Sequence, residues 1–200
     1  MNNQPIKPAP LVERFESGAS RGEALDIGAG RGDNALFLAQ KGFSVTAIEI
    51  KKEAAETIES RAKENEASLN VVNQDAKKFL IEKDRYTFIS AMNSLNFFSK
   101  EEFYTLIESI EQGLQKEGVC VIAMFTNNDP MCEEVNIKTG GTFENDMGKK
   151  WYFPAPSELK ELFEKDFAIL FYVEAVIEDK GHPGNEEPHQ HAVARIAVKK

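Results

Sequence analysis

Apolar and polar residues alternate along the first two thirds of the chain in a pattern that predicts strands and helices in turn. Five short apolar runs predict buried strands, at 23–28, 43–50, 68–74, 86–94 and 119–125. Segments before and between these runs predict helices, at 11–17, 33–41, 51–65, 76–82 and 99–115. Strands and helices in this alternation are typical of a parallel sheet covered on both faces.

The helix at 99–115 carries the clearest local signals. Ser99 can cap its N-terminus, and Glu102 follows at the spacing of a capping box. Its apolar residues recur at helical spacing and form one face: Phe103, Leu106, Ile107 and Ile110. The segment is therefore expected to begin at Ser99 and to be a helix with a single apolar face.

The alternation stops after the fifth predicted strand. Residues 127–153 are polar, contain glycines and predict no regular element. A helix with Ser157 as its cap is predicted next, and two long strands follow at 168–178 and 191–200. The connection between these strands is rich in proline and glycine, so we expect an antiparallel hairpin with a long tip.

Composition and charge narrow the functional classes. With 200 residues, of which 42% are hydrophobic and 28% charged, the chain can build one domain with a core. The sequence contains neither an apolar run of the ~18 residues that a membrane helix needs nor a signal-peptide core, so a cytoplasmic location is expected. Because the net charge is −9 and the basic residues are scattered, nucleic acid and membrane partners are disfavoured. A small-molecule substrate is favoured, and the oligomeric state is left open.

The stretch ALDIGAGRGDN joins the first strand to a helix through Gly28, Gly30 and Gly32. A dinucleotide-binding loop has its third glycine where this chain has Asp33. A pyrophosphate would gain from the helix N-terminus, but the carboxylates of Asp26 and Asp33 would repel it. They favour a ligand with ammonium and sulfonium groups and no phosphate, which describes S-adenosylmethionine.

Two more carboxylates follow at the ends of the next predicted strands. Glu49 can accept two hydrogen bonds from ribose hydroxyls, and Asp75 is placed to reach the exocyclic amine of an adenine. Each signal alone is weak. Together they fall at the carboxyl ends of three successive strands, where ligands of open α/β sheets bind.

The stretch ALDIGAGRGDNALFLAQKGFSVTAIEI resembles the cofactor site of the class I S-adenosylmethionine-dependent methyltransferases. Within that class, four segments are most similar to the tellurite-resistance methyltransferases: GRGDNALFLAQKGF, CEEV, YFPAPSELKELFE and the GH…H hairpin tip. The resemblance implies a single α/β Rossmann-like domain over 1–200, a three-layer sandwich with a seven-stranded, mostly parallel sheet. Its strand order is 3-2-1-4-5-7-6 with strand seven antiparallel, with 1–20 as an N-terminal helix and lid and 127–153 as a substrate-side insertion.

The resemblance also assigns cofactor-binding residues one by one: Asp26, Gly28, Gly30, Gly32, Glu49, Ile50, Asp75, Ala76 and Asn93. Ile50 is expected to pack on the adenine, and Asn93 to face the methionine part. The segment AMNSLNFF has no Asn/Asp-Pro-Pro-aromatic motif, which argues against methylation of planar amides or DNA adenine; NNDP follows strand five and does not replace it. The family implies small soft acceptors, such as tellurium or selenium oxyanions and thiols.

Methyl transfer of this kind is an in-line displacement at a carbon that the sulfonium already activates. Proximity and alignment can supply about 7–11 kcal/mol, and a general base matters only for hydroxyl or amine acceptors, so we assign no catalytic base. Five aromatic residues are expected near the pocket edge, either packing as a lid or contacting the acceptor: Phe97, Phe98, Trp151, Tyr152 and Phe153. Cys132 is expected to be an incidental thiol.

All three histidines lie in GHPGNEEPHQH, and His189 and His191 share one face of a strand start, near His182. Three interpretations stay open: a solvated hairpin tip, a small transition-metal site, or imidazoles that line the acceptor pocket and hold an oxyanion. Because the tip should lie at the same sheet edge as the cofactor, the pocket is preferred and no metal ligand is assigned.

Two other functions compete with a small-molecule methyltransferase. One is a cofactor-binding regulatory module without catalysis, against which the complete glycine loop and both downstream acids argue. The other is a methyltransferase acting on protein or RNA, which the net acidity and small size disfavour.

Overall fold

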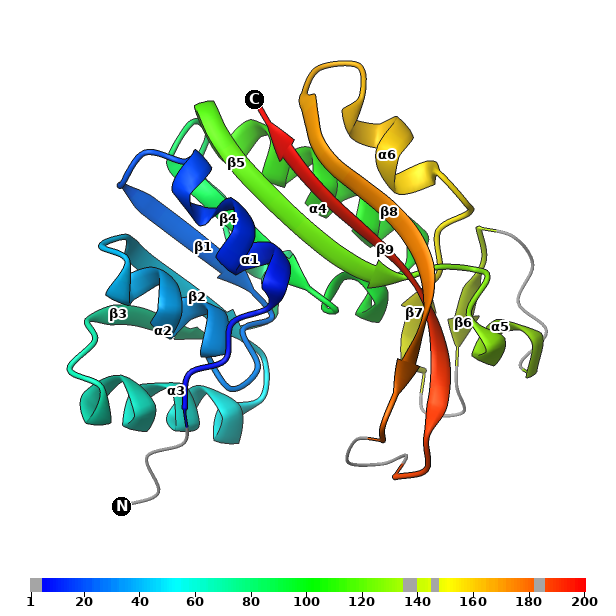
Figure 1. The fold of residues 1–200 in the computed structure, drawn as a ribbon, viewed down its shortest axis with the longest axis horizontal. Coiled ribbons are helices and arrows are strands. Elements are labelled where there is room, and N and C mark those ends of the chain that lie inside the picture. Colours follow the sequence, from blue (N-terminus) through cyan, green and yellow to red (C-terminus); the bar gives the residue numbers. More distant parts are fainter. Residues whose placement is uncertain (1–4, 135–139, 145–147, 182–185) are drawn as a thin grey trace.

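The computed structural model describes residues 5–134, 140–144, 148–181 and 186–200. Its centre is a seven-stranded sheet of order β3-β2-β1-β4-β5-β9-β8 (Figure 1). The strands are β1 (Glu23–Ile27), β2 (Ser44–Glu49), β3 (Leu69–Asn73), β4 (Tyr86–Met92), β5 (Leu114–Phe125), β8 (Ala168–Asp179) and β9 (His189–Lys199). The first five pair in parallel, and β9 is antiparallel to both of its neighbours. The predicted order is confirmed, with β8 and β9 as strands six and seven.

Helices cover the sheet on both faces. They are α1 (Pro10–Phe15), α2 (Asp33–Gln40), α3 (Lys52–Glu64), α4 (Lys100–Gly113), α5 (Pro130–Glu134) and α6 (Glu158–Phe163), with 3₁₀ turns η1 (Glu16–Gly18), η2 (Ala76–Lys78) and η3 (Leu95–Phe97). Leu11 of α1 and Ile58 of α3 pack in one apolar layer, and Phe103 of α4 packs in the other. Because side chains alternate along β5, Val121 points into the first layer and the buried Cys120 into the second.

Helix α4 begins as its sequence predicts. Ser99 accepts a hydrogen bond from the backbone N–H of Glu102, and the Glu102 carboxylate accepts one from the N–H of Ser99. All four residues of the predicted apolar face are buried. The capping box therefore fixes where the chain leaves η3, next to the carboxyl edge of the sheet.

Two local predictions are wrong. The helix expected at 76–82 is only the single turn η2, because the chain becomes extended at Phe79; the Asp75 carboxylate caps the start of this turn. Ser157 precedes α6 but does not cap it with its side chain, since its backbone is left-handed with a φ of 67°. The carboxylate of Glu158 accepts the N–H of Ala155 instead.

The segment after β5, for which the sequence predicted nothing, contains α5 and a separate two-stranded antiparallel sheet. The sheet consists of β6 (Thr142–Glu144) and β7 (Lys150–Tyr152). Such short strands show no periodicity that a sequence pattern could reveal. The β8–β9 hairpin lies beside this segment and extends past the end of β5, whose last residue, Phe125, pairs with Val193 (Figure 1).

Within the described residues, no helix is both long and apolar enough to cross a membrane. The cytoplasmic location and the absence of nucleic-acid partners stay predictions.

Replacing Ser99 by alanine should lower the free energy of unfolding by about 1 kcal/mol, because it removes a capping box. Urea unfolding followed by circular dichroism measures the change. The matched control is Ser109→Ala, the same substitution inside α4, which should alter stability by less than about 0.5 kcal/mol. Equal effects of the two substitutions would contradict the role of the cap.

Candidate cofactor and acceptor site

The loop between β1 and α2 bends through three left-handed glycines. A Cβ atom added at Gly28 would lie 2.4 Å from the Cβ of Ser94, and one at Gly32 would lie 3.0 Å from two carbons of Ile58. A Cβ added at Gly30 would have no atom within 4 Å. Gly28 and Gly32 thus allow tight packing against Ser94 and Ile58, whereas the backbone at Gly30 is open to a ligand.

Asp26 lies at the end of β1 beneath this loop and is 1% exposed. Its Oδ1 accepts a hydrogen bond of 2.7 Å from the Ser90 hydroxyl. Its Oδ2 is buried and makes no hydrogen bond within the described part of the chain. Burial raises the pKa of Asp26 to about 6; the Ser90 hydroxyl and, more weakly, the backbone N–H of Ala35 oppose the rise, and Glu49 adds to it. A buried carboxylate oxygen without a hydrogen bond is strongly stabilised by a cationic donor.

Glu49 ends β2 and is held against the glycine loop. Its Oε2 accepts the N–H of Gly30 and its Oε1 accepts the N–H of Lys51, each at 2.8 Å. A carboxylate has lone pairs for further donors, so Glu49 is oriented and can still bind a pair of hydroxyls. The next residue, Ile50, exposes 63% of its surface, so its side chain is available to pack against an apolar face of a ligand.

Asp75 and Asn93 follow the next strands out from this centre. Asp75 Oδ1 accepts the N–H of Lys77 at 3.1 Å, and its Oδ2 lies 3.6 Å from the Lys77 ammonium. Ala76 begins the η2 turn beside it. Asn93 is exposed at the end of β4, where a left-handed φ of 54° turns the chain and its N–H donates to the carbonyl of Ala123.

Asn96 connects this centre to the segment after β5. The side chain is 1% exposed and makes three hydrogen bonds. Its Nδ2 donates to the carbonyls of Phe125 and Tyr152 at 2.9 and 2.8 Å, and its Oδ1 accepts the N–H of Phe125 at 2.8 Å. One amide therefore joins η3 to the end of β5 and to β7. Asn96 could not be predicted from the sequence, because an asparagine in AMNSLNFF has no distinguishing pattern.

The five candidate aromatic residues divide into two groups. Phe98, Tyr152 and Phe153 are buried, so packing accounts for them. Phe97 is 60% exposed, and its ring meets that of Trp151 edge-on with centroids 6.4 Å apart. The structure thus brings together two of the five aromatics that were expected near the pocket edge.

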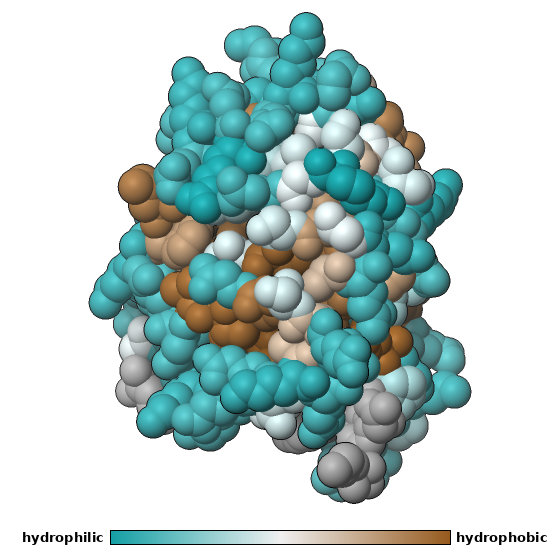
Figure 2. Space-filling model, turned by 90° about the vertical axis from the view of Figure 1, so that its left-hand side faces the viewer, coloured by the Kyte–Doolittle hydropathy of each residue, from teal (hydrophilic) through white to brown (hydrophobic). Residues whose placement is uncertain are grey.

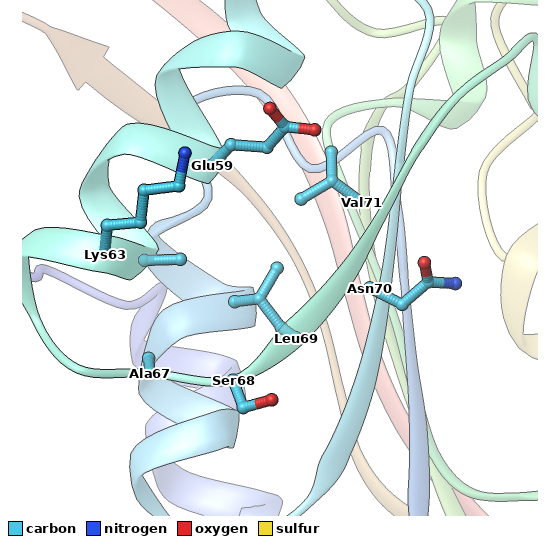
Figure 3. Close-up of a pocket in the computed structure, with 8 residues that line it drawn as sticks. Glu59, Lys63, Ala67, Ser68, Leu69, Asn70 and Val71 are labelled. Carbon is cyan, nitrogen blue, oxygen red and sulfur yellow. The ribbon is translucent and has the colours of Figure 1, made fainter.

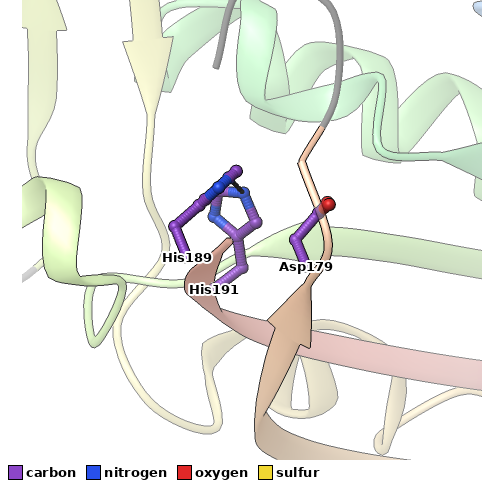
Figure 4. A group of neighbouring side chains, drawn as sticks. All are labelled: Asp179, His189 and His191. Atoms are coloured by element: carbon purple, nitrogen blue, oxygen red, sulfur yellow. Dashed lines mark hydrogen bonds between the residues drawn. The ribbon is translucent and has the colours of Figure 1, made fainter. Parts of the chain in front are cut away.

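His189 and His191 lie on one face of β9, as predicted, and their Nε2 atoms are 2.9 Å apart (Figure 4). His191 stacks on Phe125, and its Nδ1 lies 2.9 Å from Oδ2 of Asp129. Asp129 is 2% exposed and also accepts the backbone N–H groups of Met131 and Ala192. Both histidines precede Val193, the partner of Phe125 at the end of β5, so they lie at the carboxyl edge of the parallel strands.

Asp129 belongs to NNDP, which the sequence analysis set aside because it follows strand five. Its role is visible only when β9 returns beside β5. His182 lies outside the described residues. Cys132 is buried in α5, with its Sγ 3.8 Å from the carbonyl of Thr126, and burial raises the pKa of its thiol to about 11.

Comparison with known proteins connects this arrangement to a family. The family model described as "Methyltransferase domain" matches residues 24–118. This range holds the glycine loop and the acids at the ends of β1, β2 and β3. Residues 24–118 are therefore similar to a methyltransferase domain, as the resemblance of the glycine loop predicted.

Two curated relatives are ubiquinone biosynthesis O-methyltransferases. The protein from Rickettsia akari (strain Hartford) is 33% identical over 124 residues, covering 60% of this chain and 48% of the relative. The one from Rickettsia canadensis (strain McKiel) is 27% identical over 122 residues, covering 60% and 50%. The chain thus spans about half the length of the curated relatives it matches.

Solved structures share the fold at low sequence identity. TehB from Haemophilus influenzae has a TM-score of 0.77 at 20% identity, covering 100% of this chain and 64% of that one. A methyltransferase from Methanosarcina mazei has a TM-score of 0.74 at 19% identity, covering 96% and 97%.

S-adenosylmethionine is the methyl donor of class I methyltransferases, and the described residues of this chain fit it. Asp26 offers a buried, unsatisfied oxygen to an ammonium group, and Gly30 leaves room for close approach. Glu49 is oriented for ribose hydroxyls, and Ile50 offers an apolar face. The individual assignments, including Asp75, Ala76 and Asn93, stay predictions.

Asp33 does not act as the sequence analysis expected. Its Oδ1 accepts from Arg61 at 2.8 Å and from the N–H of Lys7 at 3.1 Å. The Arg61 guanidinium neutralises its charge, and the neighbouring Asn34 accepts the N–H of Ala9. Asp33 and Asn34 therefore fasten the N-terminal segment to α2, and Asp26 is the carboxylate left for a cation.

A surface depression elsewhere is not part of this site. It lies between α3 and the start of β3, where Lys63, Leu69 and Val71 line it (Figure 3). Figure 2 shows the side of the molecule that carries β3, with apolar surface framed by hydrophilic residues. Leu69 begins β3, whereas Asp75 follows its other end. The depression therefore lies away from the carboxyl edge.

Replacing Gly30 by alanine should weaken cofactor binding at least tenfold, because the new Cβ would occupy the space left for the ligand. Gly42→Ala is the matched control, since both glycines have a positive φ and neither Cβ would meet a protein atom within 4 Å. Both variants should lose about 1 kcal/mol of stability. Calorimetric titration with S-adenosylhomocysteine should detect an affinity loss only in Gly30→Ala, and a similar loss in both would overturn this placement of the ligand.

Cofactor affinity should fall as the pH is lowered from about 7.5 to about 5. Protonation of Asp26, whose pKa burial raises to about 6, removes the charge that attracts the ammonium group. Below that pKa the affinity should drop by up to about tenfold per pH unit. Titration with S-adenosylhomocysteine at several pH values measures the slope, which Asp26→Asn should abolish.

Stability provides the control for this experiment. The folded-state pKa of Asp26 lies above its ordinary value of 3.8, so the folded state binds the proton more tightly. This group therefore contributes more stability as the pH falls through about 6, and that contribution is lost as the pH rises. Loss of binding together with retained thermal stability near pH 5 supports the assignment. An affinity independent of pH contradicts it.

Proposed function

We propose that this protein transfers the methyl group of S-adenosylmethionine to a small soft nucleophile by in-line displacement. The acceptor is a tellurium or selenium oxyanion or a thiol. The observation that carries the proposal is the placement of the His189–His191 pair at the same sheet edge as the glycine loop. The sequence resemblance to the tellurite-resistance methyltransferases and the fold shared with TehB support it.

Residues from three elements border the proposed acceptor space. Phe97 follows β4 and Trp151 belongs to β7, and their rings are in contact. His191 reaches the same edge from β9, held by Asp129. Imidazole N–H groups donate to oxyanions, and aromatic rings exclude water from the reacting atoms. Asn93 follows the end of β4, four residues before Phe97.

The displacement needs alignment more than it needs acid–base chemistry. The sulfonium of the bound donor supplies an activated carbon. Asp26 would fix the methionine end and Glu49 the ribose, so the loop would set the direction from which an acceptor must approach. A thiolate or oxyanion already carries its lone pair, so the residues around it need only position it.

A second candidate is O-methylation of a hydroxyl acceptor. The matching ubiquinone biosynthesis O-methyltransferases favour it, and so does the Asp129–His191 pair. A buried carboxylate that holds Nδ1 of a histidine is the arrangement that orients a general base. In this case Nε2 of His191 would take the proton of the acceptor hydroxyl.

One assay separates these functions. The protein is incubated with methyl-labelled S-adenosylmethionine and, separately, tellurite, selenite, small thiols, catechols, RNA and protein extract. Label in volatile or thioether products supports the proposal, and label in an aryl ether supports the second candidate. Label in macromolecules, or binding without transfer, would overturn both.

The double substitution His182→Ala with His191→Ala should lower turnover at least tenfold and leave cofactor affinity within a few fold, because the hairpin histidines are proposed to serve the acceptor and not the donor. Turnover comes from the labelled assay and affinity from calorimetry. Lys180→Ala, which alters an exposed residue on the same hairpin, should change neither. Unchanged turnover on the true acceptor would remove the histidines from the site.

A further inference from the structure

We propose that Asp179, His189 and His191 form a binding site for a divalent transition-metal ion on the β8–β9 hairpin. Each residue offers one ligand atom, and the three atoms lie within 4.8 Å of one another (Figure 4). Asp179 is the direct partner of His189 across the strand pair, and His191 follows two residues later on the same face. Two adjacent strands therefore present all three side chains together.

The hydrogen bonds of the two rings decide what their facing atoms can do. Nδ1 of His189 lies 2.8 Å from the carbonyl oxygen of Glu187, which can only accept a hydrogen bond. Nδ1 of His191 lies 2.9 Å from the carboxylate of Asp129, which accepts in its ionised form. These partners favour the tautomer with the proton on Nδ1, in which a neutral ring can present the lone pair of Nε2 to a metal ion.

At 2.9 Å the two Nε2 atoms can share a cation, either a proton in a hydrogen bond or a metal ion that both nitrogens bind. Zinc bonds to histidine nitrogen are 2.0–2.1 Å long, and tetrahedral geometry then sets the two nitrogens roughly 3.3 Å apart. The pair needs to open by only a few tenths of an ångström to accept such an ion. The Asp179 carboxylate supplies the third ligand, and one of its oxygens is already oriented by the N–H of Gly181 at 2.8 Å.

Asp129 is a positioning residue for this site. It is buried, it holds the ring of His191 through Nδ1, and two backbone N–H groups hold it in turn. Carboxylates in this second position fix the tautomer of a metal-binding histidine and raise its basicity. A site assembled by chance on a surface hairpin would have no such support from the end of β5.

Two imidazoles and a carboxylate suit zinc, cobalt or nickel. Three protein ligands leave a coordination position open, as in metal sites that bind a substrate. If the proposed function holds, a thiolate or oxyanion acceptor is the ligand of suitable chemistry for that position. Metal binding itself does not depend on methyl transfer.

The test uses tag-free protein that has been treated with chelator and desalted, without cofactor or acceptor. Cobalt(II) is titrated and its visible absorption recorded, and zinc chloride is titrated by calorimetry. We expect one ion per chain, a cobalt spectrum of low coordination number, and displacement of cobalt by zinc. Failure of this test leaves the methyl-transfer assay unaffected, and failure of that assay leaves this one unaffected.

Variants locate the ion. His189→Gln and His191→Gln should each weaken binding at least tenfold, and Asp129→Asn should weaken it about 10–100-fold without changing the stoichiometry. Glu187→Gln is the matched control, because it removes a charge from the same hairpin but keeps the carbonyl that orients His189. Circular dichroism confirms that each variant folds.

Three results would overturn the proposal. They are binding no tighter than about 100 μM, binding that survives both histidine substitutions, and binding that falls equally in Glu187→Gln.

Discussion

The contact between the ends of β1 and β4 determines the geometry of the cofactor site. Asp26 and Ser90 are partners in this strand pair, and the Ser90 hydroxyl donates to the carboxylate at 2.7 Å. Just beyond, the Ser94 hydroxyl donates to the carbonyl of Ile27 at 2.7 Å, so close that residue 28 has no room for a side chain. The glycine loop must therefore turn away on one side, and the Asn93 turn on the other. The ligand space opens between them because the two chains meet so tightly below it.

Burying Asp26 in this contact has a cost, which is visible in its raised pKa. A carboxylate without a full set of donors is unfavourable in the interior. A cationic ligand can supply the missing hydrogen-bond partner, and the unfavourable burial of the carboxylate then contributes to the free energy of ligand binding.

The buried polar residues on the acceptor side have their hydrogen bonds satisfied within the protein. Asn96 and Asp129 are also buried, but each makes three hydrogen bonds or ring contacts that join separate segments. Satisfied polar residues of this kind rigidify the part of the molecule they connect.

The sequence predicted the strands and most helices because their signals are local. Ile58 and Phe103 recur at helical spacing, and Glu49 and Asp75 are acids that directly follow apolar runs. The errors arose where a residue is controlled by a distant partner. The sequence predicts that the Asp33 carboxylate is available to a ligand, because its partner Arg61 lies 28 positions away along the chain. Asp129 gained its meaning only from β9, 62 positions later. Asn96 and the short strands β6 and β7 have no periodicity, so no pattern reading could find them.

The acceptor side of the site combines an aromatic pair, Phe97 and Trp151, with a carboxylate–histidine pair, Asp129 and His191. The two pairs favour acceptors of different charge. Transfer from a sulfonium to an anion cancels charge, so surroundings of low polarity favour it, and the exposed ring of Phe97 with the half-buried ring of Trp151 would provide them. Transfer to a neutral hydroxyl releases the hydroxyl proton, which a base must accept. His191, which Asp129 orients through Nδ1, is a base of this kind. A metal ion at His189 and His191 would affect both kinds of transfer. It would hold an acceptor as its anion near neutral pH and would occupy the lone pair that a general base needs. The same imidazole nitrogen cannot serve as base and ligand at once, so occupation of Nε2 of His191 decides which chemistry this edge of the sheet supports.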